Sequence, residues 1–175
     1  MNLRRTIGSC IALLALTATS AGAATSDVAD AVMRGDLSSA RALLTRKADV
    51  NTPQADGATA LHWAVYRNDL AAVDLLLKAG ARVKVANSFG ATPLSLAAQN
   101  GNAAITKLLL DAGADPNEQM LNTDTALMMA SRTGDVATMQ LLLDRGADVN
   151  AKETTRGTTA LMWAAAQHHP AAVRL

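Results

Sequence analysis

Residues 59–64 read Thr-Ala-Leu-His-Trp-Ala, and this short stretch decides the fold because its pattern returns three times. It recurs as Thr-Pro-Leu-Ser-Leu-Ala at 92–97, as Thr-Ala-Leu-Met-Met-Ala at 125–130 and as Thr-Ala-Leu-Met-Trp-Ala at 159–164, at steps of 33, 33 and 34 residues. A leucine triplet keeps the same register at 75–77, 108–110 and 141–143. A period of this length indicates stacked repeats.

The residue chemistry of one repeat predicts a pair of helices. Thr59 is a good N-cap for a short helix that ends near Asn68, a residue that tolerates left-handed backbone. Asp69 caps a second helix, which presents its leucines at helical spacing and ends at Gly80. Polar and turn-forming residues then return the chain to the next threonine. Such a pair has more apolar surface than it can bury alone, so neighbouring repeats must stack.

These motifs resemble the ankyrin repeat, and the resemblance covers residues 24–175. It implies an all-α solenoid of stacked helix-turn-helix units joined by hairpin-like loops. The period divides the chain into four units and a partial fifth, at 27–56, 57–89, 90–122, 123–156 and 157–175. The extra residue behind the 34-residue step falls within 151–156, in a loop, where an insertion changes stability little.

Three departures from the repeat pattern carry structural expectations. Lys47 stands where later repeats have the glycine that ends the second helix, so we expect a left-handed conformation that costs about 1 kcal/mol. Thr123 replaces the turn glycine of the other loops. The sequence ends at Leu175, in the middle of an expected second helix, which favours a fragment of a longer array over a terminal helix that frays.

Residues 1–23 are predicted to be a secretory signal peptide. Arg4 and Arg5 precede a short apolar run, and an Ala-Gly-Ala site at 21–23 follows it. The run is shorter than the ~20 residues that span a bilayer. We therefore expect cleavage after Ala23, with an uncleaved anchor as the alternative. This predicts a bacterial protein that is periplasmic or secreted.

Composition and charge exclude several classes of protein. The chain has 16 Lys+Arg and 15 Asp+Glu, a formal net charge of +1, which offers no basic stripe for nucleic acid. Aromatic residues make up only 2%, while Ala and Leu abound, so an all-β fold is disfavoured. Cleavage would remove Arg4, Arg5 and Cys10, leaving a net charge of −1 and no cysteine. Packing alone, without disulfide bonds, must then hold the fold.

No set of residues predicts catalysis, a metal site or a cofactor. The ankyrin resemblance implies structural hydrogen bonds for His62, and no second histidine lies at metal or triad spacing. The adjacent His168 and His169 do not share a helix face and are interpreted as corner residues. Acidic residues at 111–118 recur one period later, at 144–150, which favours turn chemistry over a calcium loop. We expect a protein that is not an enzyme and that binds no cofactor.

The two tryptophans and the loop tips have different expected roles. Trp63 and Trp163 occupy the position of a buried leucine in the first helix, which predicts core packing. The resemblance implies that loop tips and first-helix ends line a concave face that binds partners. The matching positions that we expect to contact a partner are Tyr66, Arg67, Phe89, Gln99, Asn100, Asn122, Asp124, Arg132 and Arg156.

Two aromatic residues are central to that expected face. Tyr66 and Phe89 are predicted to be exposed and about one repeat apart. Together with Arg67 and Arg132 they would form a mixed aromatic and basic patch of the composition found in interaction hot spots.

The function that this pattern predicts is a non-catalytic, exported scaffold that binds a protein partner on its concave face. We expect a monomer with no nucleic-acid partner and no stable membrane insertion once the signal peptide is removed. Two alternatives remain open. The array could be the recognition arm of a longer enzyme or transport component whose working domain lies beyond residue 175, or it could be a secreted effector.

Overall fold

The computed structural model describes residues 26–121 and 123–175 of the chain. The signal peptide expected at residues 1–23 lies outside the described residues. The described residues form ten α-helices in five pairs, and no β-strand. The first helices of the pairs are α1 (Asp27–Met33), α3 (Ala60–Tyr66), α5 (Pro93–Gln99), α7 (Ala126–Thr133) and α9 (Ala160–Ala166). The second helices are α2 (Leu37–Thr45), α4 (Leu70–Lys78), α6 (Ala103–Asp111), α8 (Val136–Asp144) and α10 (Pro170–Val173).

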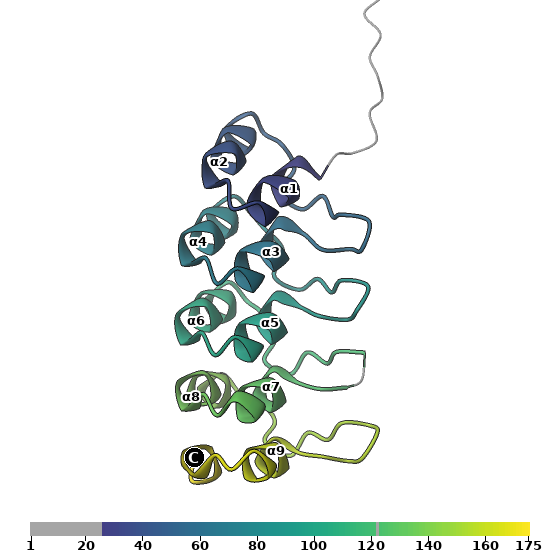
Figure 1. Ribbon diagram of the computed structural model, residues 1–175, viewed down its shortest axis with the longest axis vertical. Helices are drawn as coiled ribbons and strands as arrows, with labels where there is room; N and C mark the ends of the chain where they lie inside the picture. Colours follow the sequence, from purple (N-terminus) through teal and green to yellow (C-terminus); the bar gives the residue numbers. More distant parts are fainter. Residues whose placement is uncertain (1–25, 122) are drawn as a thin grey trace, which may run out of the picture.

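The pairs stack into a solenoid, as the sequence predicts. First helices begin at residues 27, 60, 93, 126 and 160, so the period of 33 and the final step of 34 are confirmed. Each first helix contacts the first helix of the next pair, and α4, α6 and α8 contact one another in the same order. Figure 1 shows two columns of helices, with loops that project from the first-helix column on the side away from the second helices.

Capping by short polar side chains fixes where the helices begin. The hydroxyl of Thr92 accepts a hydrogen bond from the Ser95 N–H at 3.2 Å at the start of α5. At the start of α4, the Asp69 carboxylate accepts from the Ala72 N–H at 3.0 Å. Asp36 caps α2 and accepts from the side chains of Ser38 and Ser39 and from the Ser39 N–H, which lowers the pKa of its carboxyl to about 2. These contacts satisfy backbone donors that a helix start otherwise leaves free.

The core consists of leucine rows that run along the stack. The leucines of the threonine motif, at 61, 94 and 127, are at most 1% exposed. The middle leucines of the triplets, at 76, 109 and 142, are completely buried. Burying each such side chain contributes about 1.5–3 kcal/mol. Leu161, the equivalent residue in α9, is 53% exposed because no further helix pair within residues 26–121 and 123–175 packs against it.

Backbone strain occurs where the repeat pattern lacks its glycine. Lys47 has φ 62° and Thr123 has φ 60°, which confirms the left-handed conformation expected of Lys47 and shows that Thr123 adopts it too. Asn68 and His168 take the same conformation, both with φ 58°, at the corner between the two helices of a pair. Pro170 follows at the first position of α10, where its missing N–H is harmless.

The loops between repeats are hairpin-like, and the last one contains the inserted residue. In the loop before α3 the Gln54 N–H donates to the Ala58 carbonyl at 2.8 Å, and in the loop before α9 the Glu153 N–H donates to the Thr158 carbonyl at 3.2 Å. The tip spanned by the second bond is one residue longer. The insertion therefore lies between 153 and 158, which agrees with the expected range.

Within the part of the chain that the structure describes, no helix has the length and apolar character needed to cross a bilayer.

Candidate partner-binding surface

We refer to the surface formed by the loop tips and the first helices as the loop face. It corresponds to the concave face expected from the sequence. Tyr66 is 65% exposed and Phe89 76% exposed, as expected. The remaining expected residues that are exposed on this face are Arg67, Gln99, Asn100, Arg132 and Arg156. Asn122 lies outside the described residues.

Asp124 does not belong to this surface. It was expected to contact a partner, yet only 4% of its surface is exposed. The position directly before the capping threonine lies at the base of the hairpin-like loop, where the Asp124 carbonyl accepts from the Met120 N–H at 3.0 Å. Ala58, the equivalent residue of an earlier repeat, is equally buried. The expectation for Asp124 is therefore wrong for the folded repeat.

Three aromatic side chains line one hollow on the loop face. Trp63, Tyr66 and Phe89 surround a space of about 380 Å³, together with neighbouring residues of the loops and of α3 and α5. The Trp63 and Tyr66 rings meet edge to face, with centroids 5.7 Å apart and an interplanar angle of 87°. We call this space the aromatic hollow.

The loop tips that frame the aromatic hollow are held by hydrogen bonds. The Asn87 side chain accepts from the Phe89 N–H at 3.0 Å and from the Ala91 N–H at 2.9 Å. The Ser88 N–H donates to the Asp56 carbonyl at 2.8 Å and joins two successive tips. Because these hydrogen bonds already order the backbone, the loop that carries Phe89 loses less conformational entropy on binding than a disordered loop would.

Trp63 lies partly in the core and partly in the hollow, so the expectation of core packing alone is incomplete. The indole packs against buried residues but remains half-buried. Its Nε1–H donates to the Gln54 Oε1 at 2.6 Å. An indole is longer than the leucine it replaces, and the extra length reaches the surface.

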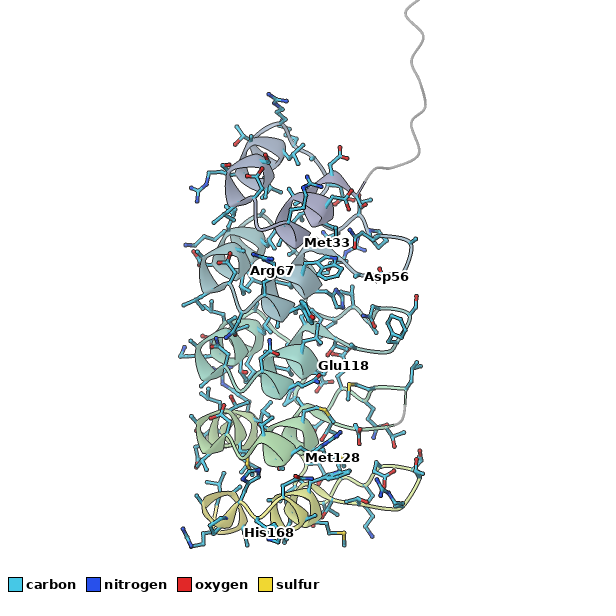
Figure 2. The ribbon with its side chains drawn as sticks, in the orientation of Figure 1. Met33, Asp56, Arg67, Glu118, Met128 and His168 are labelled. Carbon is cyan, nitrogen blue, oxygen red and sulfur yellow. The ribbon has the colours of Figure 1, made fainter. Side chains whose placement is uncertain are left out.

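Arg67 and Asn100 connect adjacent repeats along the loop face. The Arg67 Nη1 donates to the Met33 carbonyl at 3.4 Å, and Figure 2 shows the two side by side, with Asp56 on the loop side. The Asn100 Nδ2 donates to the Val65 carbonyl at 2.8 Å. Part of the donor capacity of these two side chains is therefore used within the fold.

Arg132 and Arg156 gather around Trp163, away from Tyr66 and Phe89. The guanidinium carbon of Arg132 lies 4.7 Å from the Trp163 ring centroid and that of Arg156 lies 5.5 Å from it. Arg132 also lines a hollow of about 340 Å³ with Gln99, Met129, Thr133 and Gln167. The single mixed patch expected from the sequence is thus two clusters, because Arg132 lies on α7 and Tyr66 lies on α3.

His62 has a structural role, as the resemblance implies. It is only 2% exposed, and its Nδ1 accepts from the Thr59 N–H at 3.1 Å. Nε2 must then carry the proton, and it donates to the Ala91 carbonyl at 3.1 Å, across to the next repeat. Burial lowers the pKa of this imidazole, although the contact with the Ala91 carbonyl acts in the opposite direction.

Within the acidic stretches at 111–118 and 144–150, Asp115 and Asp148 hold turns, whereas Asp111 and Asp144 end α6 and α8. The Asn117 N–H donates to the Asp115 carboxylate at 2.9 Å, and the Asn150 N–H donates to the Asp148 carboxylate at the same distance. Over residues 26–121 and 123–175, no three His, Cys, Asp or Glu side chains converge in a way that could hold a metal ion.

A family model described as ankyrin repeats (3 copies) matches residues 28–120 and again residues 117–175. The chain belongs to the ankyrin-repeat family. Ankyrin repeats in general mediate contacts between proteins, and the family is typically non-catalytic. A search of the curated proteins found no match.

Within this ankyrin array, the sequence did not predict that both tryptophans reach the surface. Leu96 and Met129 occupy the same helix position as Trp63 and Trp163, so the repeat pattern alone favours a core assignment. Residue size was the available signal, since an indole at a position that elsewhere holds leucine must extend beyond the layer. The contact between Arg156 and Trp163 had no signal in the pattern, because it arises in the loop with the inserted residue.

Proposed function

We propose that this ankyrin array is a non-catalytic scaffold that binds a protein partner on its loop face, and that it acts outside the cytoplasm. The observation that carries the proposal is the aromatic hollow. Three of the four aromatic residues of the chain, Trp63, Tyr66 and Phe89, line it. Aromatic side chains supply much of the binding energy at protein interfaces, and contiguous apolar patches at the surface of a soluble protein mark interaction sites.

The shape and chemistry of the hollow suit an apolar side chain of a partner. Its lining is mainly carbon, and Asp56 and Asn87 at its edge use side-chain oxygens to hold their own loops. A bulky apolar residue that enters would displace water from three aromatic rings. The surrounding loop backbone would then provide the polar rim typical of interfaces.

Export is supported by the arrangement of the first residues. Arg4 and Arg5, the apolar run and the Ala-Gly-Ala site at 21–23 have the order of a cleaved secretory signal. We therefore propose a periplasmic or secreted location. N-terminal sequencing of the protein recovered outside the cytoplasm should find Ala24 first, and an intact Met1 in that material would overturn the export proposal.

A photo-crosslinking amino acid placed on two opposite faces tests the binding proposal. One variant carries it at Phe89 on the loop face, and a control carries it at the exposed Gln140 on α8. In cells that express the protein, illumination should join the Phe89 variant to a discrete partner protein and leave the Gln140 variant free. Adducts from Gln140 alone, or from neither position, would contradict the proposal.

A further inference from the structure

The second cluster on the loop face combines two cations that have no counterion among the described residues. Arg132 and Arg156 are exposed, and within residues 26–121 and 123–175 neither forms an ion pair. Both guanidinium groups lie over the same Trp163 ring, 4.7 and 5.5 Å from its centroid, so two like charges that repel each other lie within about 10 Å. A bound anion between or beside them would remove that repulsion.

The nearest acidic side chain along the chain cannot provide this anion. Glu153 is 5% exposed, and its carboxylate accepts from the N–H groups of Thr155, Arg156 and Thr158 at 2.6, 2.8 and 3.1 Å. Burial acts to raise the pKa of this carboxyl, but the N–H donors outweigh it and lower the pKa to about 2. The Glu153 carboxylate is therefore occupied by the backbone N–H groups of its own loop tip.

The polar atom of Trp163 also lacks a partner. Its Nε1 is buried and donates to no acceptor among the described residues. In the equivalent position, Trp63 Nε1 donates to Gln54, the residue that begins the hairpin-like tip. In the longer last loop that residue is Glu153, whose oxygens are used by the backbone. The Trp163 Nε1 is too deeply buried for a ligand from solvent to reach, so the accessible donors of the cluster are the two guanidinium groups, which pair with no carboxylate among the described residues.

The two clusters lie at opposite ends of one apolar row. Trp63, Leu96, Met129 and Trp163 hold the same position on α3, α5, α7 and α9. Leu96 lines the aromatic hollow, and Met129 lines the hollow next to Arg132. Three helix-to-helix steps of 8–10 Å separate the ends, so the clusters are roughly 24–30 Å apart. An extended peptide at about 3.3 Å per residue covers this with about eight residues.

We propose that Arg132 and Arg156, which lie over the Trp163 ring, form a carboxylate-binding site, and that it receives an Asp or Glu side chain of the partner whose apolar residue enters the aromatic hollow. This inference rests on the proposed function of the loop face and adds the chemistry of the bound segment. The segment is extended, with a bulky apolar residue and an acidic residue about eight positions apart.

Selection of peptides from a displayed random library tests the inference with a defined probe. Peptides of about a dozen residues are long enough to reach both clusters when extended. The purified protein should enrich peptides in which an aromatic or large aliphatic residue lies seven to nine positions from Asp or Glu, about the spacing of the clusters. The double variant R132Q/R156Q should bind such a peptide about tenfold more weakly, the range for lost charge-assisted hydrogen bonds.

A matched control and a peptide change make the result specific. Arg82→Gln removes an exposed charge from the turn after α4 and should leave peptide affinity unchanged. Replacing the peptide's acidic residue by Gln should weaken binding to the wild type but not to R132Q/R156Q, because that variant lacks the arginines that the acidic residue contacts. Circular dichroism should show the double variant melting within a few degrees of the wild type.

The possible failures separate the two proposals. Enriched peptides with no acidic residue, or peptides that bind R132Q/R156Q as tightly as wild type, would overturn the carboxylate site and leave the aromatic hollow in place. Peptide binding that Phe89→Ala does not weaken, or a library without binders, would overturn both. A fluorescent single-stranded oligonucleotide that binds more tightly than the acidic peptides would show a nucleic-acid site and also overturn the inference.

Discussion

At the scale of single residues, His62 shows how one side chain can serve a helix start and the next repeat together. Its two ring nitrogens hold the Thr59 N–H and the Ala91 carbonyl, and the first contact requires the neutral imidazole, because only an unprotonated Nδ1 can accept a hydrogen bond. Protonation would remove the acceptor at Nδ1 and place a charge in the core. The histidine is thus a structural element of the interface between two repeats.

This arrangement predicts a pH dependence of stability. The pKa of His62 is lower in the folded protein than its ordinary 6.5, so the unfolded chain binds the proton more strongly. Stability should therefore fall as pH decreases below about 6.5 and stop falling below the folded pKa. His62→Gln keeps an acceptor for the helix start and should show a smaller loss of melting temperature between pH 7 and pH 5.

Comparison of the wild type with His62→Gln separates the effect of His62 on stability from that of other titrating groups. Burial raises the pKa of Glu118, so titration of this carboxyl changes stability in the opposite direction, but equally in both proteins. Identical losses of melting temperature in wild type and His62→Gln would contradict the role assigned to His62.

At the scale of elements, each helix pair depends on buried leucines that repeat with the period. Leu76 on α4 and Leu109 on α6 are completely buried. Leu76→Ala or Leu109→Ala should lower the free energy of unfolding by about 2–5 kcal/mol, because each leaves a cavity. Leu121→Ala is the matched control, since this leucine is 76% exposed, and it should change stability by less than about 0.5 kcal/mol. Urea unfolding measures all three, and equal losses at Leu76 and Leu121 would mean that the register is wrong.

Asparagines in the turns connect one repeat to the next. The Asn117 Nδ2 donates to the Gly146 carbonyl at 2.9 Å, and the Asp148 N–H donates to the Asn117 Oδ1 at 2.7 Å. Asn51 makes the same two bonds, with Gly80 and Arg82. These bonds link the turns after successive second helices.

Removing one such link should weaken the interaction between neighbouring repeats. Asn117→Ala should cost about 1–2 kcal/mol, the net value of two hydrogen bonds. Asn150→Ala is the matched control, because Asn150 makes no side-chain bond to another repeat within the described residues. Urea denaturation should show the loss for Asn117→Ala only; a loss of similar size at both positions would indicate a local turn effect instead.

At the scale of the whole molecule, the sequence predicts the fold well because the repeat fixes every element several times over. A threonine precedes the first helix of four of the five pairs, the leucine triplets recur in the same register, and first helices begin at the repeat period in all five pairs. The inserted residue of the last loop was also placed correctly. Where one repeat departs from the pattern, the other repeats still predict where its helices lie.

The candidate surface was less predictable, for physical reasons. Tyr66 and Phe89 were correctly predicted to be exposed, because equivalent positions of successive repeats have similar surroundings. Asp124 was misplaced because its side chain is polar but its position at the base of a loop is buried. The cluster of Arg132 and Arg156 on Trp163 depends on side-chain directions across two repeats, which no periodic pattern contains.

The central claim is that the loop face binds a protein partner through the aromatic hollow. The most direct measurement is the affinity of the partner captured at Phe89 for three purified proteins: wild type, Phe89→Ala and Leu70→Ala. Leu70 is a 44% exposed residue at the start of α4, and serves as the control. We expect Phe89→Ala to weaken binding by about 1–2 kcal/mol or more while thermal stability stays within about 0.5 kcal/mol, and Leu70→Ala to bind as wild type does. Unchanged affinity in Phe89→Ala, or a loss confined to Leu70→Ala, would contradict the account.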